Sequence, residues 1–280
     1  MASAGLPLVG GDHYWGPATA TIDWCEENYA LCKYVAEFWN TTTNTVFFAL
    51  AMLGMWRVHS MGHERRFLLC YFSMLVVGLG SWLFHMTLKY QWQLADELPM
   101  LYGTCACIYC VLRADAREGA GLRVSAWLFA YATAVTLVYV QIRMPVFHQV
   151  AYALEVAVVL VRSAMHQIEI RKTDLRAHSE LIRLFWLGTG SFGMAFVLWN
   201  VDNIFCNELL ALRAALPVAV APLLQLHAYW HIGTALGCYA SIVYQQYLRL
   251  VKLGAGDSHC IQWLLYVLPY VERRPKAAAR

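Results

Sequence analysis

The chain has 280 residues, of which 60% are hydrophobic and only 14% are charged. Soluble domains typically carry roughly a quarter charged residues, so this composition excludes an ordinary soluble protein. The formal net charge of +3 is small. Lys and Arg lie in short segments between apolar stretches rather than in a patch with interleaved aromatics, which argues against a nucleic-acid partner.

Long apolar stretches dominate the chain from its beginning. Residues 1–16 lack the basic region and apolar core of a cleavable signal peptide, so we expect the first membrane helix to direct insertion. Seven stretches then approach the roughly 17 to 25 residues that cross a hydrocarbon core. Without period-two alternation they predict helices, not a barrel, and hence an all-α, integral membrane bundle of seven transmembrane helices. They are Thr41–Val58, Phe67–Thr87, Leu94–Leu112, Val124–Ile142, Val146–Val161, Leu184–Val201 and Leu223–Tyr247.

Basic residues predict the orientation of this bundle. Those after the first, third, fifth and last stretches fall on one side, which the positive-inside rule makes cytosolic. They include Arg57, Arg65, Arg66, Arg113, Arg117, Arg123, Arg162, Arg171, Lys172, Arg176, Arg183, Arg249, Lys252, Arg273 and Arg274. The predicted organisation is therefore a lumenal N-terminal segment (residues 1–40), a helical domain (41–247) and a cytosolic tail (248–280). Pro269 and Pro275 interrupt any helix in that tail, so a short amphipathic or disordered end is expected.

A few polar residues lie within the predicted spans and are default functional candidates, because such residues are expensive in lipid. Ser81 and His85 are four residues apart and share a helical face, as do His227 and His231. Asp96, followed by Glu97, opens the third span near the same lumenal side.

Depth decides whether these groups can meet. A short connection from Lys89 to Gln93 returns the chain, so Asp96 lies at a depth similar to that of His85. Pro217 and Pro222 suggest that the last helix is regular from Leu223, which places its two histidines roughly 6 to 12 Å inside the helix start. All these side chains can therefore occupy one layer in the lumenal half.

Three imidazoles with one open position suit a catalytic zinc, whereas structural zinc is usually closed by four protein ligands. Zinc would activate water and polarise a carbonyl; Asp96 could take the proton and Ser81 could steady the oxyanion. A lone intramembrane histidine is more often a packing residue than a metal ligand. An HxxxH pair alone is only moderate evidence for a metal site, because helices also place such pairs together by chance. We read His148 as a supporting or structural residue and Glu155 as a protonated or hydrogen-bonded acid.

Four segments make the sequence specific. They are GSWLFHMTL (residues 80–88), DELPM (96–100), WNVDNIFC (199–206) and HAYWH (227–231). Together they resemble the alkaline ceramidases, over nearly the whole chain from about Tyr14. The resemblance implies a seven-helix zinc amidase of endoplasmic reticulum or Golgi membranes that cleaves ceramide into a sphingoid base and a fatty acid. It also implies His85, His227 and His231 as zinc ligands, with Ser81 and Asp96 beside the metal.

The N-terminal DWCEEN segment (residues 23–28) is similar to the calcium site of the same family. Carried over by position, the implied ligands are Asp23, the Trp24 carbonyl, Glu26, Asn28 and Glu37. Clustered oxygen ligands suit calcium, although without the resemblance a solvated acidic segment is the simpler interpretation.

Nine cysteines are present, and Cys70, Cys105, Cys107, Cys110 and Cys238 fall within spans as packing thiols. Cys25 and Cys206 both fall on the predicted lumenal side, where oxidation is permitted. We predict that they form a disulfide, which the family resemblance also suggests, with Cys32 as the competing partner.

Two other functions are weighed against hydrolysis. One is a seven-helix zinc-containing receptor of the adiponectin-receptor type, and the other is a transporter with a His and Asp proton relay, for which no inverted repeat is found. No obligate protein partner is evident. Acyl-chain length and unsaturation, sphingoid-base preference, pH optimum and oligomeric state do not follow from the sequence.

Overall fold

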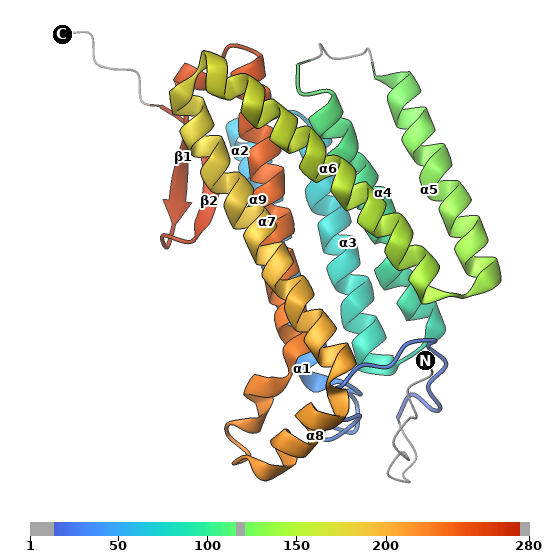
Figure 1. Ribbon diagram of the computed structural model, residues 1–280. Helices are drawn as coiled ribbons and strands as arrows, with labels where there is room; N and C mark the ends of the chain where they lie inside the picture. Colours follow the sequence, from blue (N-terminus) through green and yellow to red (C-terminus); the bar gives the residue numbers. More distant parts are fainter. Residues whose placement is uncertain (1–13, 116–120, 275–280) are drawn as a thin grey trace.

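A computed structural model describes residues 14–115 and 121–274. Figure 1 shows a bundle of long helices, with the N-terminal segment and α8 covering one end and a β-hairpin lying beside the other half. The elements are α1 (Phe38–Thr43), α2 (Thr45–Met61), α3 (Arg66–Thr87), α4 (Tyr90–Leu112), α5 (Leu122–Ile142), α6 (Pro145–Thr173), α7 (Leu175–Ile204), α8 (Cys206–Ala215), η1 (Ala221–Leu224), α9 (Leu226–Lys252), η2 (Gly256–Ser258), β1 (His259–Leu264) and β2 (Leu268–Arg273).

Long helices make up most of the fold. In the described part of the chain, α2, α3, α4, α5, α6, α7 and α9 each have at least 17 residues. Four of these, α3, α5, α6 and α7, are also apolar enough to cross a membrane. A mostly helical chain with four candidate membrane-spanning helices is thus confirmed for the described residues, while seven crossings and the orientation of the termini stay predictions.

Helix ends differ from the apolar windows. Helix α6 extends well past Val161, and helix α7 begins well before Leu184. Both helices continue beyond their apolar windows because the charged residues there have good helix propensity. Asp174 is the residue between them, and its Oδ1 caps α7 by accepting a hydrogen bond from the Ala177 N–H at 2.9 Å. Helix α9 begins at Leu226 rather than Leu223, since residues 221–224 form a 3-10 turn.

The expectation of a short amphipathic or disordered end is wrong for residues 259–273. These residues form an antiparallel hairpin in which Ile261 pairs with Val271, and both side chains are buried. Pro269 is accommodated near the start of β2, an edge strand, where its missing N–H is tolerated. Residues 1–13, Arg117 and residues 275–280 lie outside the described residues, and so do the predictions made on them.

The main core lies between α2, α3 and α9, with α7 packed along α9. Tyr71, Tyr239 and Leu248 are among its fully buried side chains. Helix α5 lies at the outside of the bundle (Figure 1), and the buried residues on it are Ala132, Val135 and Tyr139. The polar residues considered below lie where the core helices meet the N-terminal segment.

Helices α3 and α4 approach most closely at Gly80. A Cβ added to Gly80 would lie 2.0 Å from the Ala95 carbonyl oxygen. The neighbouring residues in the chain are Ser81 and Asp96, so the missing side chain of Gly80 allows these two polar groups to meet.

We therefore expect Gly80→Ala to destabilise the protein by about 1–3 kcal/mol, the usual cost of overpacking. The measurement is the melting temperature of the purified protein. Gly190→Ala is the matched control, because a Cβ there meets nothing within 4 Å and a helical alanine is favoured over glycine by up to about 1 kcal/mol. Equal melting temperatures for the two variants would contradict the close-approach argument.

Candidate metal centre

Three histidines converge at one end of the bundle. His85 lies in the last turn of α3, and His227 and His231 lie in the first two turns of α9. One ring nitrogen from each lies within 4.8 Å of the others, and all three side chains are buried. The structure thus brings the predicted imidazoles together, with His227 one residue after the helix start and therefore shallower than predicted.

Neighbouring side chains orient the three rings. Glu37 Oε2 lies 2.5 Å from His85 Nδ1, and Thr43 Oγ1 lies 3.0 Å from His231 Nδ1. The Trp24 ring stacks on His227 at a centroid distance of 3.9 Å. Such outer partners fix ring orientation at metal sites and leave the other ring nitrogen free to bind the ion.

The donor set fits a metal cation. His227 Nδ1 is buried without a hydrogen-bond partner, which is costly unless something binds it. No carboxylate or thiol joins the cluster within the described ranges 14–115 and 121–274, so the candidate ligands are the three imidazoles. Three imidazoles are a ligand set that zinc accepts.

Ser81 and Asp96 lie beside the histidines and line the same cavity. The Ser81 hydroxyl donates a hydrogen bond to the Asp96 carboxylate. Glu97 is tied away from that pair: its Oε2 accepts hydrogen bonds from Tyr139 Oη at 2.5 Å and from Gln93 Nε2 at 3.3 Å. The two adjacent acids therefore have different hydrogen-bond partners, although both line the cavity.

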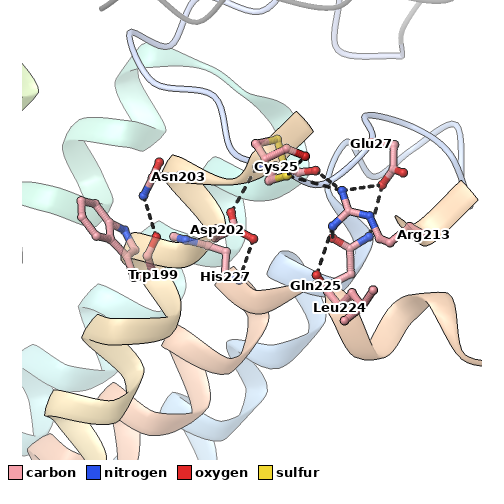
Figure 2. The surroundings of a disulfide bond; sticks show 10 residues. Cys25, Glu27, Trp199, Asp202, Asn203, Arg213, Leu224, Gln225 and His227 are labelled. Carbon is pink, nitrogen blue, oxygen red and sulfur yellow. Dashed lines mark hydrogen bonds and ion pairs between the residues drawn. A yellow bond between two sulfur atoms is a disulfide. The ribbon is translucent and has the colours of Figure 1, made fainter. Parts of the chain in front are cut away.

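A disulfide joins Cys25 to Cys206, as predicted, and Cys32 is a free thiol. Figure 2 shows Asp202 between this disulfide and His227. Asp202 Oδ1 accepts a hydrogen bond from the His227 N–H at 3.3 Å, and Oδ2 accepts one from the Cys25 N–H at 3.4 Å. A single buried carboxylate thereby links the N-terminal segment to the start of α9.

Arg213 of α8 forms a second link between the N-terminal segment and the start of α9. Its guanidinium donates to the Cys25 carbonyl, to the Leu224 carbonyl at 3.2 Å and to Gln225 Oε1 at 3.0 Å (Figure 2). It also forms an ion pair with Glu27 at 3.3 Å. These contacts hold the chain that enters α9 against the disulfide.

The predicted calcium ligands form an acidic group in the N-terminal segment, next to the histidines. Asn28 Nδ2 donates to Asp23 Oδ1 at 3.4 Å, and Asn28 Oδ1 and Glu37 Oε1 are buried without partners. Trp24 contributes its N–H to Glu37, whereas its carbonyl is the predicted ligand atom. Glu26 instead accepts hydrogen bonds from the Trp39 and Asn40 N–H groups at 2.7 and 2.8 Å, at the start of α1.

Electrostatics in this acidic group favour a cation. Burial, and then the neighbouring Glu37 carboxylate, raise the pKa of Glu26 to about 8. Among the residues described, no Lys or Arg forms an ion pair with Asp23, Glu26 or Glu37. A bound cation would relieve the repulsion between these acids.

A cavity of about 550 Å³ opens beside the histidines. Its polar lining includes Ser81, Asp96, Glu97, His148, His227 and His231, and most of the remaining lining is apolar. A second cavity of about 180 Å³ shares Cys107 and other lining residues with it and extends toward Tyr244. Cavities of this size and polarity are typical of sites for apolar ligands.

Two polar residues left open by the sequence analysis have structural partners. His148 Nε2 lies 2.8 Å from the Glu97 carbonyl and lines the large cavity, which agrees with a supporting role. Glu155 is buried, and its Oε1 accepts a hydrogen bond from Cys105 Sγ at 3.4 Å. Glu155 does not line either cavity described above.

Several known proteins that are similar to this chain are alkaline ceramidases. The chain is 38% identical to alkaline ceramidase 3 of Mus musculus over 271 residues, covering 96% of this chain and 98% of that protein. It is 32% identical to alkaline ceramidase YPC1 of Saccharomyces cerevisiae over 277 residues, covering 91% and 84% of the two chains. An alkaline ceramidase of Arabidopsis thaliana is 29% identical over 264 residues, with 94% and 96% covered.

A family model covers nearly all of the described structure. The model described as Ceramidase matches residues 16–272, a range that includes the three histidines, Ser81, Asp96, the disulfide and the hairpin. On this match and the identity to the mouse protein, the chain belongs to the ceramidase family.

Proposed function

We propose that this protein is a zinc-dependent amide hydrolase that cleaves ceramide within the membrane, releasing a sphingoid base and a free fatty acid. The observation on which this rests is the convergence of three buried imidazoles, two of which, His227 and His231, line a large apolar cavity. A lipid amide has the matching shape, with a polar linkage between two hydrocarbon chains.

His85, His227 and His231 would hold the zinc. Zinc bound there supplies Lewis-acid chemistry, lowering the pKa of water and polarising the amide carbonyl. Glu37 and Thr43 keep two of the imidazoles in position through the Nδ1 contacts described above. Because Glu37 accepts from His85 Nδ1, it favours the tautomer whose Nε2 is free.

Asp96 and Ser81 divide the remaining work. The Asp96 carboxylate takes a proton from the attacking water as the carbon–oxygen bond forms, and it passes this proton to the amine nitrogen as the carbon–nitrogen bond breaks. The Ser81 hydroxyl, which donates to Asp96 in the present geometry, turns to donate to the developing oxyanion.

The cavity would hold the hydrocarbon chains. Its lining includes Met74, Val156, Leu160 and Ile242, which lie away from the histidines along α3, α6 and α9. A hydrocarbon chain that moves from the membrane into this lining stays among apolar groups, so the transfer itself contributes little hydrophobic free energy. The shape of the lining instead positions the chains, and with them the amide, at the polar lining of the cavity.

We propose seven crossings, with the N-terminus in the lumen of the endoplasmic reticulum or Golgi and the C-terminus in the cytosol. The Cys25–Cys206 disulfide lies at the end covered by the N-terminal segment, and disulfides persist in oxidising compartments. Arg171, Lys172 and Lys252 lie in the last turns of helices at the opposite end. Basic residues there agree with a cytosolic face.

We also propose that the acidic N-terminal group binds calcium through Asp23, the Trp24 carbonyl, Glu26, Asn28 and Glu37. The two unpartnered buried oxygens, Asn28 Oδ1 and Glu37 Oε1, support this assignment. Since Glu37 also contacts His85, calcium would stabilise the arrangement that orients a zinc ligand.

Membership of the ceramidase family disfavours the adiponectin-receptor alternative. A receptor would require neither Asp96 nor Ser81 beside the metal. Release of fatty acid from ceramide by the purified protein, with no added partner, separates the two functions.

His231→Ala tests the metal assignment. Loss of an outer partner of a metal ligand already costs about 10- to 100-fold, so we expect loss of a ligand to lower ceramide hydrolysis at least about 100-fold, with zinc lost in parallel. Fatty acid release and zinc content are measured on the same preparation. His166→Ala is the control, because His166 is also buried but lies outside the histidine cluster, where it contacts the Val111 carbonyl. Full activity of His231→Ala, or an active parent without zinc, would refute the mechanism.

Asp23→Asn tests the calcium assignment. Removal of one negative ligand is expected to weaken calcium binding about tenfold or more, since ligand charge sets calcium affinity. Isothermal titration of the purified protein with calcium measures this. In the control Glu27→Gln, calcium affinity should be unchanged, because the Glu27 carboxylate contacts Arg213 and Gln225 instead. The assignment fails if the two variants bind calcium equally well.

A further inference from the structure

The hairpin ends in an exposed apolar turn. Leu264, Leu265, Tyr266 and Val267 follow one another, and Leu265 and Tyr266 are 78% and 96% exposed. Contiguous apolar residues this exposed mark contact with another apolar phase or partner. This turn has no role in the proposed hydrolysis, because it lines neither cavity described above.

The backbone of the turn makes the choice of residues more unusual. Leu265 and Tyr266 have φ values of 50° and 62°, in the left-handed region. Glycine, asparagine or aspartate is normally found in such hairpin turns, because larger side chains are strained there. Two large apolar residues therefore occupy backbone positions at which glycine, asparagine or aspartate would be less strained.

The turn lies beside the middle of the bundle rather than beyond its end. The Pro269 carbonyl accepts a hydrogen bond from Tyr239 Oη at 2.9 Å, and Tyr239 is near the midpoint of α9, which runs from Leu226 to Lys252. Figure 1 shows the hairpin running alongside the helices, with its turn directed away from the end that holds the α6–α7 connection.

The hairpin is fixed in this position by α2. The Arg57 guanidinium lies 3.7 Å from the Tyr270 ring centroid and 4.7 Å from that of Trp56. Trp56 and Met52, one turn apart on α2, are themselves exposed. The apolar turn thus continues an apolar outer surface of the helical bundle, which includes membrane-spanning helices.

We propose that the turn formed by residues 264–267 inserts into the lipid leaflet on the side of the membrane where α9 ends, and that its partner there is lipid acyl chains. Polarity along the hairpin agrees: Asp257, His259 and Arg273 lie at its open end, whereas the turn is wholly apolar. Trp263 and Tyr270 lie between, as aromatic residues do at membrane interfaces.

Backbone pairing makes this insertion feasible. All six residues of β1 pair with β2, and the Val267 N–H donates to the Leu264 carbonyl at 3.2 Å within the turn. Peptide groups satisfied in this way lower the cost of entering lipid, whereas the outward-facing groups of a two-stranded ladder have no partner strand and limit the depth of insertion. The segment predicted as a free cytosolic tail is, on this proposal, partly a membrane element.

Site-specific fluorescence in the full-length protein tests the proposal. An environment-sensitive fluorescent amino acid replaces Tyr266, or Asp257 as the matched control, and each protein is reconstituted into phosphatidylcholine vesicles. With the probe at residue 266 we expect blue-shifted emission, quenching by lipids with acyl-chain nitroxides, and an iodide quenching constant several-fold smaller than with the probe at 257. A second label at Leu265 guards against a local defect.

Two results would overturn the proposal. Iodide quenching at 266 and 265 as strong as at 257, without quenching by nitroxide lipids, would place the turn in water. Protection from both quenchers would show that another protein surface, such as a second copy of the chain, covers it.

Discussion

The metal centre depends on two buried helix ends lying at the same depth. The last turn of α3 leaves carbonyl groups without helical partners, and the first turn of α9 leaves N–H groups, and buried polar groups of this kind must be satisfied. The N-terminal segment satisfies the first set, since the Ala36 and Glu37 N–H groups donate to the Met86 and His85 carbonyls at 3.0 Å. Asp202 satisfies part of the second set at His227. Its negative charge also lies at the positive end of the α9 dipole.

The same segment connects these ends with the proposed calcium group. Glu37 contacts both His85 and Asn40, at 2.5 and 3.0 Å, and the disulfide ties Cys25 to the start of α8. A change in the N-terminal segment would therefore shift a metal ligand although no residue of the cavity had changed. Structure and chemistry are coupled here because the N-terminal segment completes the end of α3 directly and reaches the start of α9 through Asp202.

Sequence patterns predicted the local part of this site. The spacing of His227 and His231, and of Ser81 and His85, follows directly from helical periodicity. The contacts of Glu37 and Asp202 could not be predicted from residue patterns, because each joins segments far apart in the chain; Cys25 and Cys206 alone are separated by 181 residues. The hairpin was not predicted for two reasons. Pro269 argued against regular structure, and the consecutive apolar residues at the turn obscure the alternation of buried and exposed side chains to which Ile261 and Val271 belong.

The central claim is that three histidines hold a zinc ion with an open position. X-ray absorption at the zinc edge of the purified, active protein tests it most directly. The account predicts three nitrogen neighbours at about 2.0–2.1 Å and one oxygen neighbour, with no sulfur. A sulfur shell near about 2.3 Å, or an active preparation without zinc, would contradict it.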